Sequence, residues 1–160
     1  MSEEPKLSAA SAKPPRPDTG AILYDLPSPY IPHPVFGLLH LPRFIAKIRK
    51  HLAGQLPPSY QRNFTKGFDG FLCLHLGVDP QAVIAAVRDS NGEENLIARL
   101  KALFPADVKV AKWNRQVVQI GMSPMGQESL NSTKKKMAIS DREDLRSFAD
   151  MIEYDEERID

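Results

Sequence analysis

The sequence predicts an all-α fold, a single compact domain of six or seven short helices behind a proline-rich N-terminal segment. After residue 40, apolar side chains recur at spacings of three and four, which is the period of an α-helix. The alternation of apolar and polar residues that is typical of a half-buried strand does not occur. A length of 160 residues leaves room for one domain and a tail.

The N-terminal region differs in composition from the rest of the chain. Residues 1–25 are rich in Ser, Ala, Pro, Lys and Glu, which bury too little apolar surface to offset the entropy of ordering, so we expect a disordered tail. Closely spaced prolines predict an extended strap over residues 26–40, which either docks Leu26, Tyr30 and Ile31 on the body or serves as a proline-rich ligand for another protein. The helical domain is expected over residues 41–160.

The first helix is expected to begin near Leu41. Pro42 suits the first turn of a helix, where its missing N–H would have no partner in any case. Gly54 supplies a left-handed end. Between them, four apolar side chains fall on one helical face: Phe44, Ile45, Ile48 and Leu52.

The middle of the chain predicts three more helices. Residues 68–76 are almost wholly apolar, and we interpret them as a buried helix rather than a buried strand. Asp79 and Pro80 are typical of the N-cap and first turn of the next helix. Ser90 and Glu93 have the spacing of a capping box, which predicts the start of a third helix that Pro105 ends.

The C-terminal part predicts the remaining helices. Residues 108–120 contain several β-branched side chains, but the three- and four-residue spacing of the apolar ones favours a helix. A further helix is expected over residues 124–137. Ser140 and Glu143 repeat the capping-box spacing, which predicts the start of the last helix.

Charge is distributed unevenly, although 21 Lys and Arg residues nearly balance 20 Asp and Glu residues. No acidic residue occurs between Asp25 and Asp69, and the first helix carries Arg43 and Lys47 beside its apolar face. The last 20 residues hold nine acidic side chains and three arginines. Two interpretations remain open. The acidic last helix packs near the basic first helix, or the first helix presents an open basic surface that gathers an anionic ligand or partner.

Composition and motifs exclude several functional classes. The lone Cys73 closes no intrachain disulfide, and among Leu and Phe it is expected to be a buried hydrophobic group with a raised pKa. Four separated histidines, without a nucleophile elbow or a phosphate loop, point to no catalytic residue, metal or cofactor. Three lysines at 134–136 come without a nucleic-acid motif, which argues against nucleic acid. No apolar run has the length of a membrane span, so we expect a cytoplasmic protein.

Two polar sites in apolar surroundings leave alternatives open. Asp69 is favoured as an N-cap, and otherwise it is a partly buried carboxylate that pairs with Lys47 or Arg43. Trp113 and Asn114 either anchor the core or line the mouth of a pocket.

Four short motifs occur in a fixed order along the chain: Leu41-Pro42-Arg43 with Lys47, Gly67-Phe68-Asp69-Gly70, Trp113-Asn114, and Asp155-Glu156 with Arg158. Together they resemble a bacterial family of domains of unknown function, numbered five-zero-six-nine. The resemblance spans residues 26–158 and implies a small, mainly helical bacterial domain, but no reaction, cofactor or partner. The sequence departs from the family at Ala46, where an acidic residue is common, and at Glu157, where Gly is common.

The motifs and the charge pattern select one set of candidate ligand-binding residues. We expect a polar cluster that is either a binding site or a buried structural network: Arg43, Lys47, His51, Asp69, Trp113, Asn114, Asp155, Glu156 and Arg158. The leading hypothesis is a helical binding module without catalysis, whose basic first-helix surface engages an anionic small molecule or an acidic protein surface. The alternative is a small-molecule enzyme in which Lys47 and Arg43 clamp an anionic substrate while Asp69 or His51 moves a proton.

Overall fold

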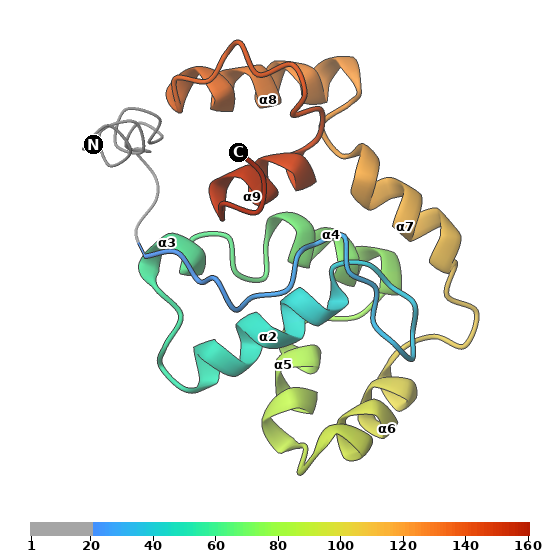
Figure 1. Ribbon diagram of the computed structural model, residues 1–160. Helices are drawn as coiled ribbons and strands as arrows, with labels where there is room; N and C mark the ends of the chain where they lie inside the picture. The colour runs from blue at the N-terminus through green and yellow to red at the C-terminus, as the bar shows by residue number, and fades with distance from the viewer. Residues whose placement is uncertain (1–20) are drawn as a thin grey trace, which may run out of the picture.

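The computed structural model describes residues 21–160, in which a non-helical N-terminal segment precedes a series of helices joined by loops (Figure 1). The predicted all-α fold is confirmed, because the described residues form no strand and only an isolated antiparallel bridge between Pro32 and Leu39. The predicted tail over residues 1–20 lies outside the described residues. Over residues 21–160 the helices are α2 (Leu41–Leu52), α3 (Pro58–Gln61), α4 (Gly67–Leu76), α5 (Pro80–Asp89), α6 (Glu93–Leu103), α7 (Val110–Gln119), α8 (Pro124–Lys136) and α9 (Phe148–Asp155). These eight exceed the expected six or seven because α3 is a single turn, too short to show a period.

Helix α2 forms where the sequence predicts it. Pro42 lies in its first turn, and Gly54, with φ 70°, follows its C-terminal end. His40 occupies the N-cap position in the left-handed region, with φ 72°, and its side chain caps no backbone N–H. The buried side of α2 carries two cations as well as apolar side chains: Leu41, Arg43, Phe44, Ile45, Lys47 and Ile48. The charges predicted to lie beside the apolar face therefore point into the protein.

The first of the predicted helix caps is confirmed and the second is wrong. Asp79 caps α5, since its carboxylate accepts a hydrogen bond from the backbone N–H of Gln81. Ser90 starts no helix; it ends α5 by donating its hydroxyl to the carbonyl of Val87 at 2.8 Å. Helix α6 begins after Gly92, whose φ of 139° is a conformation that side chains rarely allow.

The last helix also begins later than predicted. Ser140 lies in the loop that follows α8, and Ser147 is the N-cap of α9, where its hydroxyl accepts a hydrogen bond from the backbone N–H of Asp150 at 3.1 Å. Ser140 with Glu143 and Ser147 with Asp150 have the same spacing. Local sequence therefore does not distinguish them, and the packing of Leu145 and Phe148 decides which pair starts the helix.

Buried apolar side chains form two clusters. The larger cluster surrounds α2 and includes Phe44, Leu72 from α4, Leu100 from α6 and Trp113 from α7. The smaller cluster joins α8 and α9 with the loop between them: Leu130, Ile139, Leu145, Met151 and Tyr154. As a result α9 lies between α8 and the main body (Figure 1).

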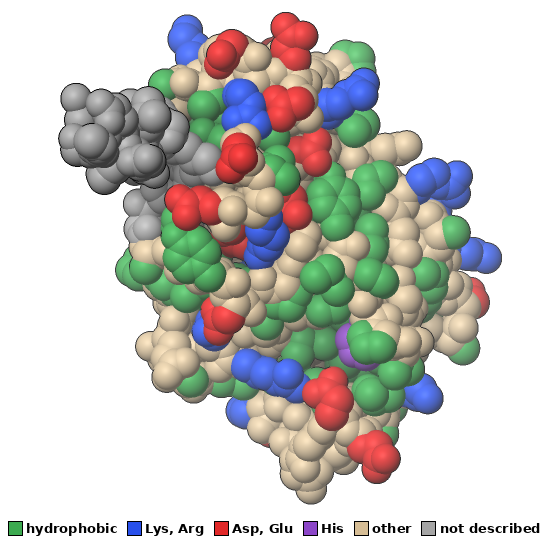
Figure 2. All heavy atoms as spheres, viewed as in Figure 1, with side chains coloured by type: hydrophobic (Ala, Val, Ile, Leu, Met, Phe, Trp, Pro, Cys, Tyr) green, Lys and Arg blue, Asp and Glu red, His purple; other side chains and the backbone are tan. Residues whose placement is uncertain are grey.

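The surface over α8 and α9 carries many carboxylates (Figure 2). The basic run at residues 134–136 lies at the end of α8, but Lys134 is buried and donates to the carbonyl of Arg142 at 2.7 Å. Only Lys135 and Lys136 of this run are exposed.

The strap over residues 26–40 runs between α2 and α9 in the view of Figure 1 and then loops round to the start of α2. Of the three side chains expected to dock, Leu26 is buried and Tyr30 donates its hydroxyl to Asp150 at 2.6 Å. Ile31 is 46% exposed and faces solvent.

Among the described residues, no single helix has both the length and the apolar character to cross a bilayer. Helices α4 and α5 reach that length and hydropathy only as a pair, and they meet at a bend of 92°.

Helix α9 approaches the end of α7 closely at Gly121, and Gly77 provides a comparison in open space. A Cβ added at Gly121 (φ 102°) would lie 2.9 Å from Cδ2 of Phe148, whereas one at Gly77 (φ 68°) would meet nothing within 4 Å. We expect Gly77→Ala to lower the free energy of unfolding by about 1 kcal/mol through backbone strain, and Gly121→Ala by about 2–4 kcal/mol because Phe148 must also move. Urea denaturation measures both losses, and equal losses would contradict this close approach.

Candidate functional site

Asp69 is the centre of a buried charge cluster. Its carboxylate lies 2.7 Å from Nζ of Lys47 and 2.7 Å from Nε2 of His40, and it accepts the backbone N–H of Thr65 at 3.0 Å. Burial opposes its ionisation, but the charge of Lys47 and the hydrogen bond from His40 outweigh burial and lower the pKa of Asp69. The favoured N-cap role is wrong. Lys66 is the N-cap of α4, and Asp69 reaches back to Thr65 from the first turn.

His40 is held in an unusual state by this cluster. An ionised carboxylate only accepts hydrogen bonds, so Nε2 of His40 carries the proton that it donates to Asp69. Burial lowers the pKa of His40 to about 4, so its ring is neutral at pH 7. The other ring nitrogen, Nδ1, is buried without a hydrogen-bond partner, and the backbone is left-handed. The unpaired Nδ1 and the left-handed backbone both cost free energy of folding. The hydrogen bond to Asp69 offsets part of this cost and fixes the orientation of the ring.

Glu156 is the second buried carboxylate. Arg43 binds it through two hydrogen bonds of 2.8 and 2.6 Å, Tyr60 donates its hydroxyl at 2.9 Å, and Arg158 lies 2.8 Å away. Burial opposes ionisation here too, but the bonds and charge of Arg43 outweigh it and lower the pKa of Glu156. Burial raises the pKa of Tyr60 to about 12, so this hydroxyl remains a donor. The acidic end of the chain thus meets the basic first helix in the interior.

The Glu156 centre also fixes the strap. Arg43 donates to the carbonyl of Pro27 at 3.2 Å, and Arg158 donates to the carbonyl of Leu26 at 2.5 Å. The hydroxyl of Tyr60 accepts the backbone N–H of Leu23 at 3.0 Å. The guanidinium groups are therefore engaged by a carboxylate and by main-chain oxygens.

Trp113 and Asn114 anchor the end of the strap. The indole Nε1 of Trp113 donates to the carbonyl of Leu39 at 2.8 Å. Asn114 accepts the N–H of Leu39 at 2.9 Å and donates to the carbonyl of Gly37 at 2.9 Å. Trp113 is fully buried, so of the two alternatives it takes the core role. The pair fixes the residues that immediately precede His40.

The structure brings together most of the residues that the sequence singled out. Arg43, Lys47, Asp69, Glu156 and Arg158 form the two carboxylate centres, and the Trp-Asn pair fixes the adjoining strap. Two candidates lie outside these centres. His51 is exposed, stacks on Phe64 at 4.7 Å and lies 3.3 Å from Gln61. Asp155 is the half-buried last residue of α9, next to the glutamate that binds Arg43.

Three contributors to the centres were not predicted from the sequence as site residues. Tyr60 lies on the single-turn helix α3, and the Thr65 contribution is a backbone N–H, so neither follows a helical pattern. His40 immediately precedes the predicted helix start, but nothing in the local pattern indicates its burial. The only sequence feature that pointed to His40 was its position just before Leu41 and Pro42, at the predicted start of the helix.

Helix α2 does not present the open basic surface of the leading hypothesis. Each of its four Lys and Arg side chains has a carboxylate partner: Arg43 with Glu156, Lys47 with Asp69, Arg49 with Glu93 and Lys50 with Asp25. The first two pairs are buried. The physical reason is that cations on the packed side of a helix require internal counter-charges.

Comparison with known protein families assigns the chain to one of them. A family model described as a domain of unknown function, DUF5069, matches residues 28–158. The chain belongs to the DUF5069 family. No curated protein and no solved structure matches it.

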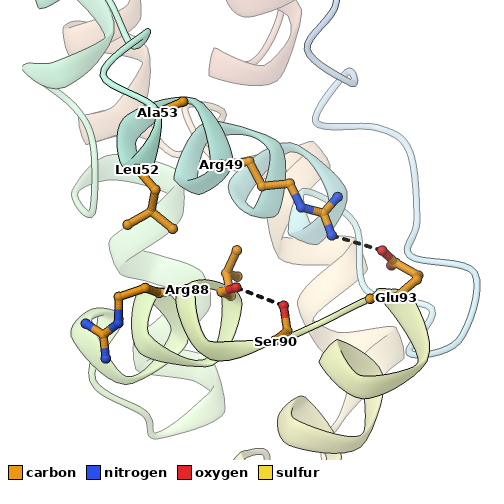
Figure 3. Close-up of a pocket in the computed structure, with 8 residues that line it drawn as sticks. Arg49, Leu52, Ala53, Arg88, Ser90 and Glu93 are labelled. Carbon is orange, nitrogen blue, oxygen red and sulfur yellow. Dashed lines mark hydrogen bonds and ion pairs between the residues drawn. The ribbon is translucent and has the colours of Figure 1, made fainter.

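The DUF5069 domain has an open cleft of about 510 Å³ between the C-terminal end of α2 and the junction of α5 with α6 (Figure 3). Arg49 and Arg88 lie on opposite sides of it, and Leu52 points into the space between the helices. Its lining is Arg49, Leu52, Ala53, Val87, Arg88, Ser90, Gly92 and Glu93. The predicted site residues do not line this cleft.

Two further kinds of chemistry receive no support in the DUF5069 domain. Over residues 21–160, no group of three His, Cys, Asp or Glu side chains is placed to hold a metal ion. Burial, followed by the charge of Asp69, raises the pKa of Cys73 to about 12, so the thiol is a buried hydrophobic group as predicted.

Removing one partner of the Asp69 centre should destabilise the fold strongly. We expect Lys47→Met to lower the free energy of unfolding by about 3–5 kcal/mol, because a buried carboxylate loses its cation. Arg49→Met, on the same helix, removes an exposed pair and should cost less than about 1 kcal/mol. Chemical denaturation distinguishes the two, and similar losses would show that Lys47 and Asp69 are not a buried pair.

The stability of the DUF5069 domain should depend on His40 between about pH 6.5 and pH 4. The folded pKa of about 4 lies below the unfolded value, so the unfolded chain binds more protons in this window and stability falls as the pH is lowered. His33, whose pKa burial also lowers, contributes in the same direction. Asp69 and Glu156, whose pKa values are lowered, lose their contributions only at lower pH.

The test is the unfolding free energy measured at several pH values. His40→Asn, which tolerates left-handed backbone, should flatten the curve, and His51→Asn should leave its slope unchanged. An unchanged slope in His40→Asn would exclude a buried neutral ring.

Proposed function

We propose that the protein is a non-catalytic helical binding module that takes a small anionic ligand at the exposed end of α2. The observation that carries this proposal is the open cleft beside Arg49, where an exposed cation borders the apolar side chains of Leu52, Ala53 and Val87. The apolar surface of Leu52, Ala53 and Val87 would contact the body of the ligand. Arg49 would bind its carboxylate or phosphate. The first helix remains the binding element, as the sequence suggested, at a different set of residues.

Arg49 is available to a ligand because its present partner holds it weakly. The Arg49 and Glu93 side chains lie 2.9 Å apart and are 52% and 59% exposed. Exposed pairs of this kind contribute only about 0–1 kcal/mol. A ligand anion with an apolar body would replace Glu93 and bury the exposed Leu52 side chain, which gives a net gain.

The enzyme alternative finds less support. It requires Arg43 and Lys47 to clamp a substrate beside Asp69, but these three side chains are buried and already bind one another or Glu156. A substrate would have to displace internal carboxylates, at the cost of leaving them unpaired in the interior. The neutral His40 ring, whose Nδ1 has no hydrogen-bond partner, is the observation that most favours catalysis, yet this side chain is only 1% exposed. We therefore propose a module, in the cytoplasm, as expected for a chain whose one cysteine is a free thiol.

A thermal-shift titration tests the proposal. Hexanoate and phenyl phosphate should raise the melting temperature, since a ligand at a hundred times its Kd adds about 2.7 kcal/mol of stability, and uncharged hexanamide should not. Arg49→Gln should weaken binding about tenfold, and Ala53→Trp, which fills the cleft, should abolish the shift. Lys135→Ala, an exposed cation on α8, is the matched control. Equal effects of Lys135→Ala and Arg49→Gln would contradict a site on α2.

A further inference from the structure

Helix α7 and its N-cap residue, Lys109, carry three exposed cations that make no ion pair within the described residues. Lys109, Lys112 and Arg115 lie at successive intervals of three residues, so they follow one side of the helix. The sequence holds no acidic residue between Asp107 and Glu128. Within residues 21–160, no ion pair engages any of the three, in contrast to the four cations of α2. Lys and Arg side chains project along the right edge of Figure 2, where Figure 1 places α7, and an acidic side chain lies below them.

Two exposed apolar side chains lie on α4, next to the start of α7. His75 makes the contact between these helices: its ring is 5.6 Å from that of Trp113, and its Nε2 donates to the carbonyl of Lys109 at 3.1 Å. Phe71, one turn before His75, is 44% exposed, and Leu74 is 78% exposed. Single exposed apolar residues are ordinary, but here a Phe and Leu pair lies on a helix that contacts α7 through His75. Exposed apolar side chains and unpaired cations on two contacting helices are the two components of a protein interface.

We propose that this α7 face, defined as Lys109, Lys112 and Arg115 with Phe71 and Leu74, docks an acidic amphipathic segment of another protein. Charge complementarity favours an acidic partner, because none of the three cations makes an ion pair within residues 21–160. The apolar pair requires that the partner also bring apolar side chains, which a simple polyanion lacks. The face is separate from the cleft beside Arg49, so either proposal can fail without the other.

The spacing of the cations sets the geometry of the partner. From Lys109 to Arg115 the helix rises about 9 Å, at about 1.5 Å per residue. Carboxylates on successive turns of a partner helix have the same repeat, whereas alternate residues of an extended strand are about 7 Å apart. A helical segment with Glu at every third or fourth position, and Leu on the adjoining face, therefore fits best.

The experiment measures the affinity of the full-length protein for a fluorescein-labelled helical peptide of this pattern, by fluorescence anisotropy at low and physiological salt. One variant neutralises the cations (Lys109→Gln, Lys112→Gln, Arg115→Gln), and a second removes the apolar pair (Phe71→Ser, Leu74→Ser). A matched control removes three charges from exposed positions elsewhere (Lys135→Gln, Lys136→Gln, Arg146→Gln). Both α7-face variants should weaken binding by about tenfold or more, and the control by less than about twofold. If a multiple variant does not fold, Lys112→Gln and Leu74→Ser replace it.

Several results would overturn the proposal. A control variant as damaging as the α7 variants would show non-specific attraction, and an intact affinity after loss of Phe71 and Leu74 would remove the apolar component. Tighter α7-dependent binding of a single-stranded oligonucleotide, or of phosphatidylcholine vesicles containing phosphatidylserine, would replace the acidic protein by another class of partner. Self-association in a sedimentation experiment that depends on the α7 face would show that the occupant is a second copy of this chain. No measurable peptide binding would also reject it.

Discussion

The arrangement of the helices depends on the pairing of buried charges along one side of α2. Arg43 and Lys47 lie about one turn apart and are both buried, so each needs a carboxylate from another part of the chain. Helix α4 provides Asp69, and Glu156, the residue that follows α9, provides the other. Apolar side chains of similar volume could stabilise the interior as well, but a guanidinium group fits only a carboxylate at a defined place. The pairs thereby fix how α4 and the residue after α9 lie relative to α2.

The same pairing explains why we propose binding away from the polar cluster formed by the sequence motifs. Arg43 and Arg158 use their donors on Glu156 and on the carbonyl groups of the strap, so the cluster ties the N-terminal strap to the end of the chain. Side-chain donors that already bind internal acceptors are not available to a ligand. Available charge remains where a cation is exposed and weakly paired, as at Arg49, or unpaired, as along α7.

The motifs that carry the resemblance to the DUF5069 family acquire structural roles. Asp69 and Glu156 are the two carboxylate centres, and Trp113 with Asn114 fixes the strap just before His40. One consequence is that these motifs describe how the domain is held together.

The sequence by itself determined the helical class, the positions of α2, α4, α5, α7 and α8, and the opposite charges of the two ends. These properties follow from spacing and capping over a few residues. Only the tertiary structure decided that Arg43 and Lys47 are buried, that Asp69 is a paired charge and not an N-cap, and that Ser147, not Ser140, starts the last helix. These depend on which distant elements come into contact, since burial and ion pairing join residues as far apart as 113 positions, beyond the reach of any local pattern.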